Sequence, residues 1–354
     1  MAKKKTSLEV LEEATNEPEV SLPPCDLSMG TDLIDLAIGQ KIGGAVGKGR
    51  YIWLSGASSS GKSFFTLSVL AEAARNQEYT DHDLIYIDAE LGASFNVEQF
   101  FGKRLAARLM RVEDIRSIER FYDFLDRREK PFVCVLDSFD SLLPESRIKA
   151  IAKAAKDRDE GKDVDGSYAM EHGKIHSERL RLMVSKLGKT GSICLGISQV
   201  RDNVGAGLYE KKDKTSGGRA LKFWSTVAIE TAAAGVIKKK INDKDRIIAT
   251  HVRVKTPEKN RISGKLRDVK VVFIPGYGIC NTSSSVEWLV DEKYVTNVSG
   301  RIQMPFYEKS YYQEDLVQKI EADGKEPELR ELLVQSWEDL ENKLALPRKA
   351  RYDD

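Results

Sequence analysis

The sequence predicts an α/β fold in which helices cover both faces of a mostly parallel central sheet. Short apolar runs alternate with helical patterns through the first two hundred residues, the order typical of βαβ units. These runs are apolar at nearly every position, as expected for strands whose two faces are both covered. The chain of 354 residues is long enough for one large core with one or two small modules.

The elements follow in a regular order. We expect parallel strands at 51–55, 84–88, 132–137 and 192–198. Helical patterns lie between them at 62–74, 115–126 and 175–187. Later apolar segments, bounded by charges and Gly or Pro, predict antiparallel strands at one sheet edge, at 227–231, 249–255 and 268–274. Two C-terminal helices are predicted at 313–322 and 328–344.

Composition changes along the chain suggest three parts. Residues 1–24 read as a polar N-terminal arm that ends in a linker at Pro23 and Pro24. Residues 25–285 form the core, and residues 286–354 a small helical region. Two charged, glycine-bearing stretches, 145–172 and 201–219, fit no element, and long loops in compact domains are usually functional or disordered.

Composition also limits the classes of function. The N-terminus lacks the apolar core of a signal peptide, and no apolar run is long enough to span a membrane. The four cysteines are far apart in sequence, which argues against a structural disulfide or zinc site and favours a cytoplasmic protein. A net charge of +1 excludes a globally basic surface, so any affinity for nucleic acid must come from particular loops.

One motif predicts nucleotide binding. Residues 56–63, GASSSGKS, match G-x-x-x-x-G-K-[ST], between a predicted strand and a predicted helix. Backbone N–H groups of such a loop turn toward phosphates, Lys62 would neutralise their charge, and Ser63 would hold Mg²⁺. A chance Gly/Ser-rich loop is the alternative, and the agreement of motif and context argues against it. The expected ATP-binding residues are Gly56, Ala57, Ser58, Ser59, Ser60, Gly61, Lys62, Ser63 and Phe64.

Two acidic residues at predicted strand ends complete this site. Asp137 ends the apolar strand 132–137, as required of a second Mg²⁺ ligand that acts through water. Glu90 follows the strand 84–88 at the carboxyl edge, where open α/β sheets bind ligands. Glu90 could orient the attacking water, although a solvated acid at a strand end explains the same residue.

Five segments in order resemble the RecA family of recombinases, including phage members of the UvsX type. They are GASSSGKS (56–63), YIDAE (86–90), VLDS (135–138), ISQVR (197–201) and SGGRALKFW (216–224). The resemblance covers about residues 25–285. It implies a RecA-like P-loop ATPase with ATP and Mg²⁺ as cofactors, whose protomers form a helical filament on single-stranded DNA and pair it with homologous double-stranded DNA.

Residue roles follow from this resemblance. Glu90 matches the catalytic glutamate, and Gln199 matches the glutamine that senses the γ-phosphate. Lys259 and Arg261 match basic residues that reach the ATP of a neighbouring protomer. Residues 146–173 and 202–219 correspond to two DNA-contacting loops, and the N-terminal arm to a segment that docks on the adjacent subunit. A single-strand-binding or mediator protein is a further expected partner; a membrane is not.

Several positions depart from the bacterial pattern. Ser198 stands where Asn usually precedes the glutamine, and Pro275 stands where an adenine-stacking Tyr is common. Ser94 and Val97 differ from the usual pair on the adenine side. The first DNA loop is also longer and more charged. These departures favour a phage-type member, which would act in the cytoplasm of a bacterial host.

The second loop has the chemistry for single-stranded DNA: flexible backbone, basic side chains and an apolar tip that could wedge between bases. The candidate contacts are Arg201, Leu208, Tyr209, Lys211, Lys212, Lys214, Gly217, Gly218 and Arg219. The basic run 147–158 fits a DNA contact and a solvated helix face equally well.

Two other classes of protein share parts of this pattern. A hexameric helicase has the same core, but the short N-terminal arm leaves little room for the extra domain such motors carry. A non-catalytic ATP-sensing regulator would not need to keep Glu90 and Gln199. A DNA recombinase therefore remains the preferred interpretation.

Overall fold

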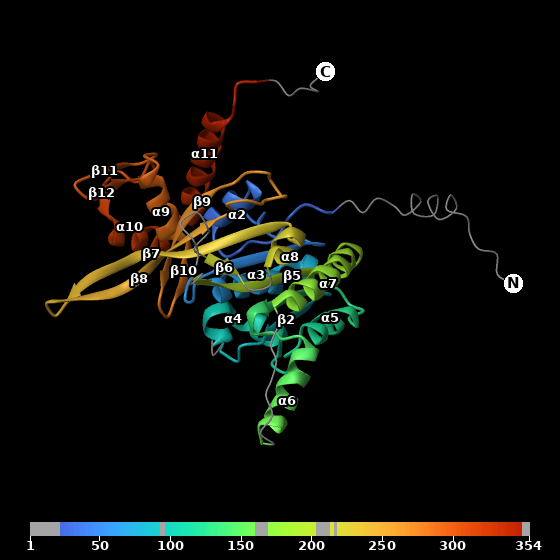
Figure 1. The fold of residues 1–354 in the computed structure, drawn as a ribbon. Coiled ribbons are helices and arrows are strands. Elements are labelled where there is room, and N and C mark those ends of the chain that lie inside the picture. Colours follow the sequence, from blue (N-terminus) through green and yellow to red (C-terminus); the bar gives the residue numbers. More distant parts are fainter. Residues whose placement is uncertain (1–21, 93–95, 160–168, 203–212, 216–217, 349–354) are drawn as a thin grey trace.

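A computed structural model describes residues 22–92, 96–159, 169–202, 213–215 and 218–348. Its centre is a ten-stranded sheet with the order β10-β9-β8-β7-β1-β5-β4-β2-β3, and β6 pairs with β5 beside this path (Figure 1). The strands are β1 Tyr51–Gly56, β2 Asp83–Asp88, β3 Leu109–Val112, β4 Phe132–Asp137, β5 Ile193–Asp202, β6 Asp213–Thr215, β7 Val227–Ile241, β8 Lys244–Lys255, β9 Asp268–Ile274 and β10 Gly278–Cys280.

Helices cover both faces of this sheet. The helices of the described residues are α2 Asp32–Gly39, α3 Lys62–Arg75, α4 Val97–Arg108, α5 Ile118–Asp126, α6 Glu145–Asp159, α7 Ala169–Thr190, α8 Gly218–Trp224, α9 Asn281–Asp291, α10 Gln313–Ala322 and α11 Glu326–Leu344, of which α6 projects from the body (Figure 1). A separate three-stranded sheet has the order β11-β12-β13. Its strands are β11 Thr296–Val298, β12 Arg301–Gln303 and β13 Tyr311–Tyr312.

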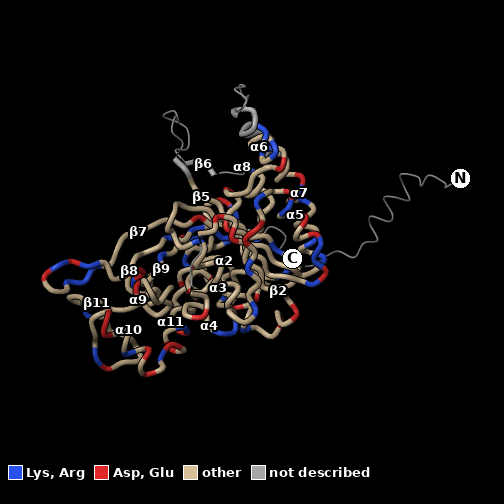
Figure 2. Tube along the Cα trace, turned by 90° about the horizontal axis from the view of Figure 1, so that it is seen from below, with Lys and Arg blue, Asp and Glu red and all other residues tan. Residues whose placement is uncertain are grey.

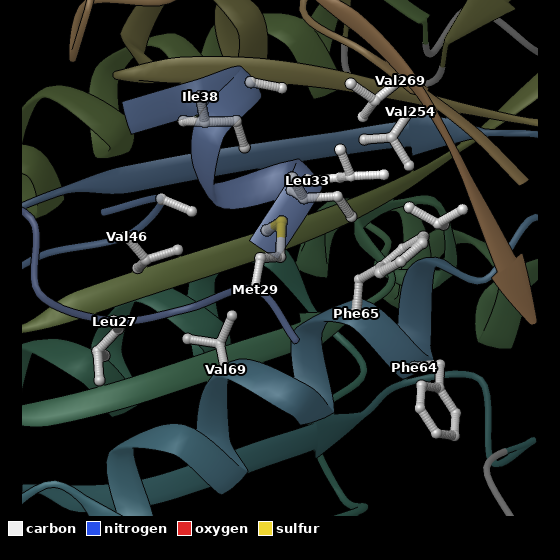
Figure 3. Close-up of a cluster of buried hydrophobic side chains, with 14 of the residues drawn as sticks. Leu27, Met29, Leu33, Ile38, Val46, Phe64, Phe65, Val69, Val254 and Val269 are labelled. Carbon is white, nitrogen blue, oxygen red and sulfur yellow. The ribbon is translucent and has the colours of Figure 1, made fainter. Parts of the chain in front are cut away.

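Alternate residues of the central strands enter two different cores. Ile52 and Leu54 of β1 belong to the core beneath α2 and α3, whereas Tyr51 and Trp53 belong to the core beneath α5 and α7. Figure 3 shows the first core, where Leu33 of α2 faces Phe65 of α3. Because successive side chains of a strand point to opposite faces, two covered faces require apolar residues at every position. The predicted covered sheet is confirmed.

The predicted strands and helices mostly match the observed elements. The helix predicted at 115–126 begins later, at Ile118, because the side chain of Ser117 caps it by accepting a hydrogen bond from the Arg120 amide. The predicted C-terminal helix 313–322 has the observed bounds, and the other begins at Glu326, two residues before its predicted start. Short strand β3 and helices α2, α4 and α9 were not predicted.

Two predictions about the edge strands and the first loop need correction. Strand β7 pairs parallel with β1, not antiparallel, because α8 returns the chain across the sheet before β7 begins. The antiparallel pairs at this edge are β7 with β8, β8 with β9, and β9 with β10. The stretch 145–172, predicted to fit no element, contains all of α6 and the start of α7. Residues 145–159 consist largely of Ala, Lys, Arg and Glu, which favour helices.

The C-terminal region contains more than the predicted helices. It includes the three-stranded sheet, and α9 crosses the predicted boundary between residues 285 and 286. Trp288 of α9 and Trp337 of α11 are buried in the same apolar core as Leu33 of α2. The division at residue 285 stays a prediction. None of the helices in the described ranges is long and apolar enough to cross a membrane.

Strands β7 and β8 continue beyond the sheet as a two-stranded hairpin (Figure 1). Asn242 and Asp243 at its turn both have a left-handed backbone, with φ of 51° and 59°, as in the tight turns that match the twist of a hairpin. Lysine and arginine residues gather at this tip and along α6 (Figure 2). Two local concentrations of basic residues, which the near-neutral net charge permits, therefore lie on projecting elements (Figure 2).

The close approach of Phe139 to β5 predicts a stability defect. A Cβ at Gly196 would lie 2.1 Å from Cε2 of Phe139, inside a fully buried part of the sheet. Gly196→Ala is therefore expected to lower the free energy of unfolding by about 1–3 kcal/mol through overpacking. Urea unfolding would measure the loss. Gly173→Ala on α7 is the control, because nothing lies within 4 Å of its Cβ position. Equal stability of the two variants would contradict the packing argument.

Candidate nucleotide-binding site

The loop between β1 and α3 forms a turn that leaves the first amides of the helix available. Gly61, directly before α3, has a left-handed backbone with φ of 80°, and no side chain caps the helix start. Ser60 Oγ donates to the Ala57 carbonyl at 2.7 Å and lies 2.7 Å from Thr231 Oγ1 on β7, which fixes the loop to the sheet. Uncapped N–H groups at a helix N-terminus favour a bound anion.

Lys62 supplies the positive charge of this loop. Its side chain is buried, and Nζ donates to the carbonyls of Gly56 at 2.9 Å and Ala57 at 2.7 Å. Burial lowers the pKa of Lys62, while the negative charges of Asp137, Glu90 and Asp140 oppose that shift. A phosphate at the helix N-terminus would stabilise the ammonium by the same Coulomb attraction.

Ser63, Asp137 and Tyr86 meet at the start of α3. Asp137 Oδ2 accepts hydrogen bonds from Ser63 Oγ at 2.5 Å and from the Tyr86 hydroxyl at 2.8 Å. Burial raises the pKa of Asp137, although both hydrogen bonds favour the charged form. A hydroxyl and a carboxylate oxygen are ligands that Mg²⁺ accepts together with waters and phosphate oxygens. The two residues predicted to hold the metal therefore lie together and fit it.

A second group of polar side chains forms at the ends of β2, β4 and β5. Glu90 Oε1 accepts hydrogen bonds from Ser138 Oγ at 2.5 Å and from Gln199 Nε2 at 2.9 Å. The backbone amide of Gln199 donates to Asp140 Oδ2 at 2.7 Å. In the parallel pairing of β1 with β5, Gly56 is opposite Gln199. The predicted catalytic acid and the predicted sensor are thus in direct contact, next to the first glycine of the loop.

Ser198, one of the departures from the bacterial pattern, has a structural partner. Its hydroxyl accepts a hydrogen bond from Trp53 Nε1 at 3.0 Å, and both side chains are buried in the sheet. Because neighbouring residues of a strand point to opposite faces, Ser198 faces this core while Gln199 faces the site. A small hydroxyl residue here satisfies the buried indole N–H.

The ends of the second predicted loop are ordered as strand and helix. Strand β5 continues to Asp202 and pairs antiparallel with β6, where Arg201 is opposite Lys214. Helix α8 then begins at Gly218, with Arg219 exposed in its first turn. The prediction that 201–219 fits no element is therefore wrong at both ends. Five predicted DNA contacts lie outside the described residues: Leu208, Tyr209, Lys211, Lys212 and Gly217.

Lys259 lies against α8. Its Nζ donates to the carbonyl of Lys222 at 3.0 Å and to that of Phe223, at the C-terminal end of this helix. Burial, with Arg261 and Lys222 nearby, lowers the pKa of Lys259 to about 8. Arg261 is exposed. Lys259 is therefore held against the helix that follows the second loop, and Arg261 lies two residues further along the same segment between β8 and β9.

The resemblance predicts adenine contacts near positions 94, 97 and 275. Pro275 is exposed on the turn between β9 and β10, and Val97 packs partly buried at the start of α4. Ser94 lies outside the described residues. The same turn carries Tyr277, whose side chain is 59% exposed, two residues after the position where an aromatic ring was expected. Sequence reasoning missed this ring because it compared only position 275.

Phe64 does not present its side chain to the loop. Its ring is buried among those of Phe100, Phe101 and Phe273, and a Cβ on Gly278 would lie 2.4 Å from it (Figure 3 shows it pointing from α3). Only the backbone of Phe64 is available to a nucleotide. This contact also packs the turn that carries Tyr277 against the helix that follows the loop.

Sequence reasoning also missed three polar residues of the site. They are Tyr86, Ser138 and Asp140, which hold Asp137, Glu90 and Gln199 in place. Ser138 and Asp140 lie just beyond the end of β4, and Tyr86 lies two residues before the end of β2. Their position at the carboxyl edge was the available signal, since ligands of open α/β sheets bind there.

These features define a P-loop nucleotide-binding protein with a mostly parallel, doubly covered sheet. The family model described as the RecA N-terminal domain matches residues 10–280, and the chain belongs to the RecA family. Protein RecA of Colwellia psychrerythraea is 27% identical over 271 residues, which cover 76% of this chain and 71% of that protein. Protein RecA of Syntrophobacter fumaroxidans is 29% identical over 267 residues, covering 75% and 70%. The phage-type assignment stays a prediction.

The contacts of Lys62 predict its role in binding. Lys62→Ala is expected to weaken binding of a fluorescent ATP analogue by about 10- to 100-fold, because a hydrogen bond to a charged group contributes about 1.5–3 kcal/mol. Titration with the analogue would measure this change. Lys103→Ala, an exposed lysine on α4, is the control and should bind normally. If the Lys62→Ala variant binds the ATP analogue as tightly as the wild type does, the assignment of residues 56–63 as a phosphate-binding loop is wrong.

Proposed function

We propose that this chain is an ATP-dependent DNA recombinase, which assembles as a helical filament on single-stranded DNA and promotes homologous pairing and strand exchange. The observation that carries the proposal is the 2.9 Å hydrogen bond between Gln199 and Glu90. It joins the residue proposed to activate water to the strand that leads into the 202–219 loop. A generic nucleotide-binding protein has no need for this link.

ATP with Mg²⁺ is the proposed cofactor. Lys62 and the amides of residues 56–64 would hold the phosphates, and Ser63 and Asp137 would hold the metal ion, whose charge stabilises the transferring phosphoryl group. The exposed ring of Tyr277 is a candidate to stack on the adenine, because Pro275 stands where the family commonly has a Tyr.

Glu90 is the proposed catalytic residue for ATP hydrolysis. Its carboxylate accepts hydrogen bonds from Ser138 and Gln199, which fix its orientation at the carboxyl edge of the sheet. A carboxylate oriented in this way can accept a hydrogen bond from the attacking water and align it with the γ-phosphate. Ser138 is in this scheme a positioning residue.

Gln199 is the proposed link between nucleotide and DNA. Its amide can exchange the contact with Glu90 for one with the γ-phosphate, because a primary amide both donates and accepts hydrogen bonds. This exchange gives the ATP and ADP states different contacts at the end of β5, and such a difference is needed to shift the following loop between two conformations. Hydrolysis would then weaken the DNA-bound state.

The filament contacts are proposed to come from two places. Lys259 and Arg261 would complete the ATP site of a neighbouring protomer, and the arm 1–24 would dock on the adjacent subunit. Both cations belong to the part of the chain between β8 and β9, on the surface rather than in the chain's own P-loop. The loops 146–173 and 202–219 would contact DNA, with a single-strand-binding or mediator protein as a further partner.

Gln199→Ala tests the link. The variant is expected to bind ATP normally, to lose the stimulation of hydrolysis by single-stranded DNA, and to bind DNA equally with ADP and with a non-hydrolysable ATP analogue. Fluorescence anisotropy with both nucleotides at two salt concentrations would measure this, and the salt dependence, which Lys and Arg contacts set, should remain.

Glu90→Gln is the comparison for the Gln199 variant. It keeps the shape of the side chain but removes the carboxylate, so hydrolysis should fall while ATP-dependent DNA binding persists. If Gln199→Ala still binds DNA much more tightly with the analogue than with ADP, the coupling does not pass through Gln199.

Mixed filaments test the action of the two cations on a neighbouring protomer. Lys259→Ala and Arg261→Ala should each fold and bind nucleotide, yet lose most DNA-stimulated ATPase activity. Addition of the Lys62→Ala protein should restore activity, because it donates intact cations to sites that still bind ATP. ATPase assays at varied mixing ratios would measure this effect, and no change at any ratio would contradict action in trans.

A further inference from the structure

The loop that carries Lys259 and Arg261 is organised around one buried amide. Asn260, between them, is 6% exposed. Its Nδ2 donates to the carbonyl of Ile38 at 2.8 Å and to that of Lys265 at 3.0 Å, and its Oδ1 accepts from the Ile262 amide at 3.0 Å. The backbone on either side of Asn260 pairs with the start of β7. This segment is therefore a fixed turn, not a free loop.

A carboxylate from the C-terminal helix holds the other end of this turn. Glu341 of α11 accepts hydrogen bonds from Arg267 Nε at 2.5 Å and Nη2 at 2.6 Å, and from Lys265 Nζ at 2.8 Å. Its side chain is 8% exposed, and the hydrogen bonds from Arg267 and Lys265 lower its pKa to about 2. Glu341 thus stays ionised, and each of its oxygens accepts from a cation.

Helix α11 is itself anchored to the body of the protein. Leu333 and Trp337 are buried in the main core, and Arg330 Nε donates to Asp32 Oδ2 of α2 at 2.9 Å. Gln40, at the end of α2, accepts from Lys265 Nζ at 3.0 Å. The contacts of Glu341 with Arg267 and Lys265, called here the clamp, therefore join the turn to two helices that are packed on the core. Arg267 and Glu341 are 74 residues apart in the sequence.

The opposite side of the turn lies against α8. Lys259 donates to the last carbonyls of that helix, and Lys222 of α8 pairs with Glu258. The turn therefore stands between a rigid support, α11, and the helix that directly follows the proposed DNA loop. The position of the backbone of this turn therefore determines which points the side chains of Lys259 and Arg261 can reach.

We propose that Glu341 is a positioning residue for Lys259 and Arg261: its clamp on Arg267 and Lys265 lets α11 set the placement of both cations toward the neighbouring protomer. This inference rests on the proposed function, because it takes action across the subunit interface as given. In this proposal the C-terminal helix α11 affects hydrolysis at the ATP site of the neighbouring protomer without contacting that site.

The test uses the full-length protein with Glu341→Gln, which keeps the shape but removes the charge. Hydrogen–deuterium exchange should show faster exchange of the amides of 256–267, a readout that does not depend on activity. The DNA-stimulated kcat should fall about tenfold, because small misplacement of a charged group at a reacting phosphate has effects of this size. Affinity of the isolated chain for nucleotide should not change.

Matched variants separate positioning from a general loss of stability. Asp339→Asn on the same helix removes an exposed carboxylate that binds Tyr294 and Lys343 but not the turn, and should behave as wild type. Arg267→Gln breaks the clamp from its other side and should repeat the effect. Addition of the Lys62→Ala protein, whose clamp is intact, should restore hydrolysis at the sites of the Glu341→Gln protein.

Each contrary outcome has one meaning. Unchanged exchange of residues 256–267 overturns the clamp, whatever the ATPase rate. Faster exchange with normal DNA-stimulated hydrolysis, while Lys259→Ala abolishes it, overturns the positioning role and leaves the proposed function standing. Loss of activity that the Lys62→Ala protein does not restore also overturns positioning. If Lys259→Ala and Arg261→Ala are themselves fully active, the proposed function fails, and the positioning role fails with it.

Discussion

The site depends on the parallel pairing of β1 with β5. This pairing sets Gly56, where the phosphate-binding loop begins, opposite Gln199, where β5 leaves the body of the sheet. Both strands are apolar on both faces, so a shift of one residue would exchange side chains between the two cores and separate Trp53 of β1 from its hydrogen-bond partner Ser198 of β5. Specific packing and this hydrogen bond therefore favour the observed register, and the register places the loop beside the Gln199–Glu90 contact.

This arrangement buries the ionisable groups of Lys62 and Asp137, where water solvates their charges poorly. Burial lowers the pKa of Lys62 and raises that of Asp137, so in each case it disfavours the ionised form. Asp137 keeps two hydrogen-bond donors, and Lys62 keeps two carbonyl acceptors. Phosphate and Mg²⁺ would add the missing opposite charges. A site built in this way favours its charged ligand by relieving unfavourable burial.

The C-terminal region is part of the same physical unit. Its tryptophans pack into the main core, and Glu341 binds two cations of the segment between β8 and β9. Ion pairs to a carboxylate that is only 8% exposed are weak evidence for stability, because desolvation of Glu341 offsets much of the attraction. It is better evidence for specific placement, since the paired hydrogen bonds to Arg267 fix both distance and direction.

The sequence by itself determined the alternation of strands and helices, the P-loop and the acids at strand ends, because these depend on local pattern and on residues near one another in the chain. It also placed Gln199 next to the phosphate-binding loop, although β5 continues to Asp202 instead of ending there as predicted. It did not determine the direction of β7, the packing of the turn bearing Tyr277 against Phe64, or the contact of Glu341 with Arg267. Those depend on packing between residues far apart in sequence, and only the tertiary structure brings such partners within hydrogen-bonding distance.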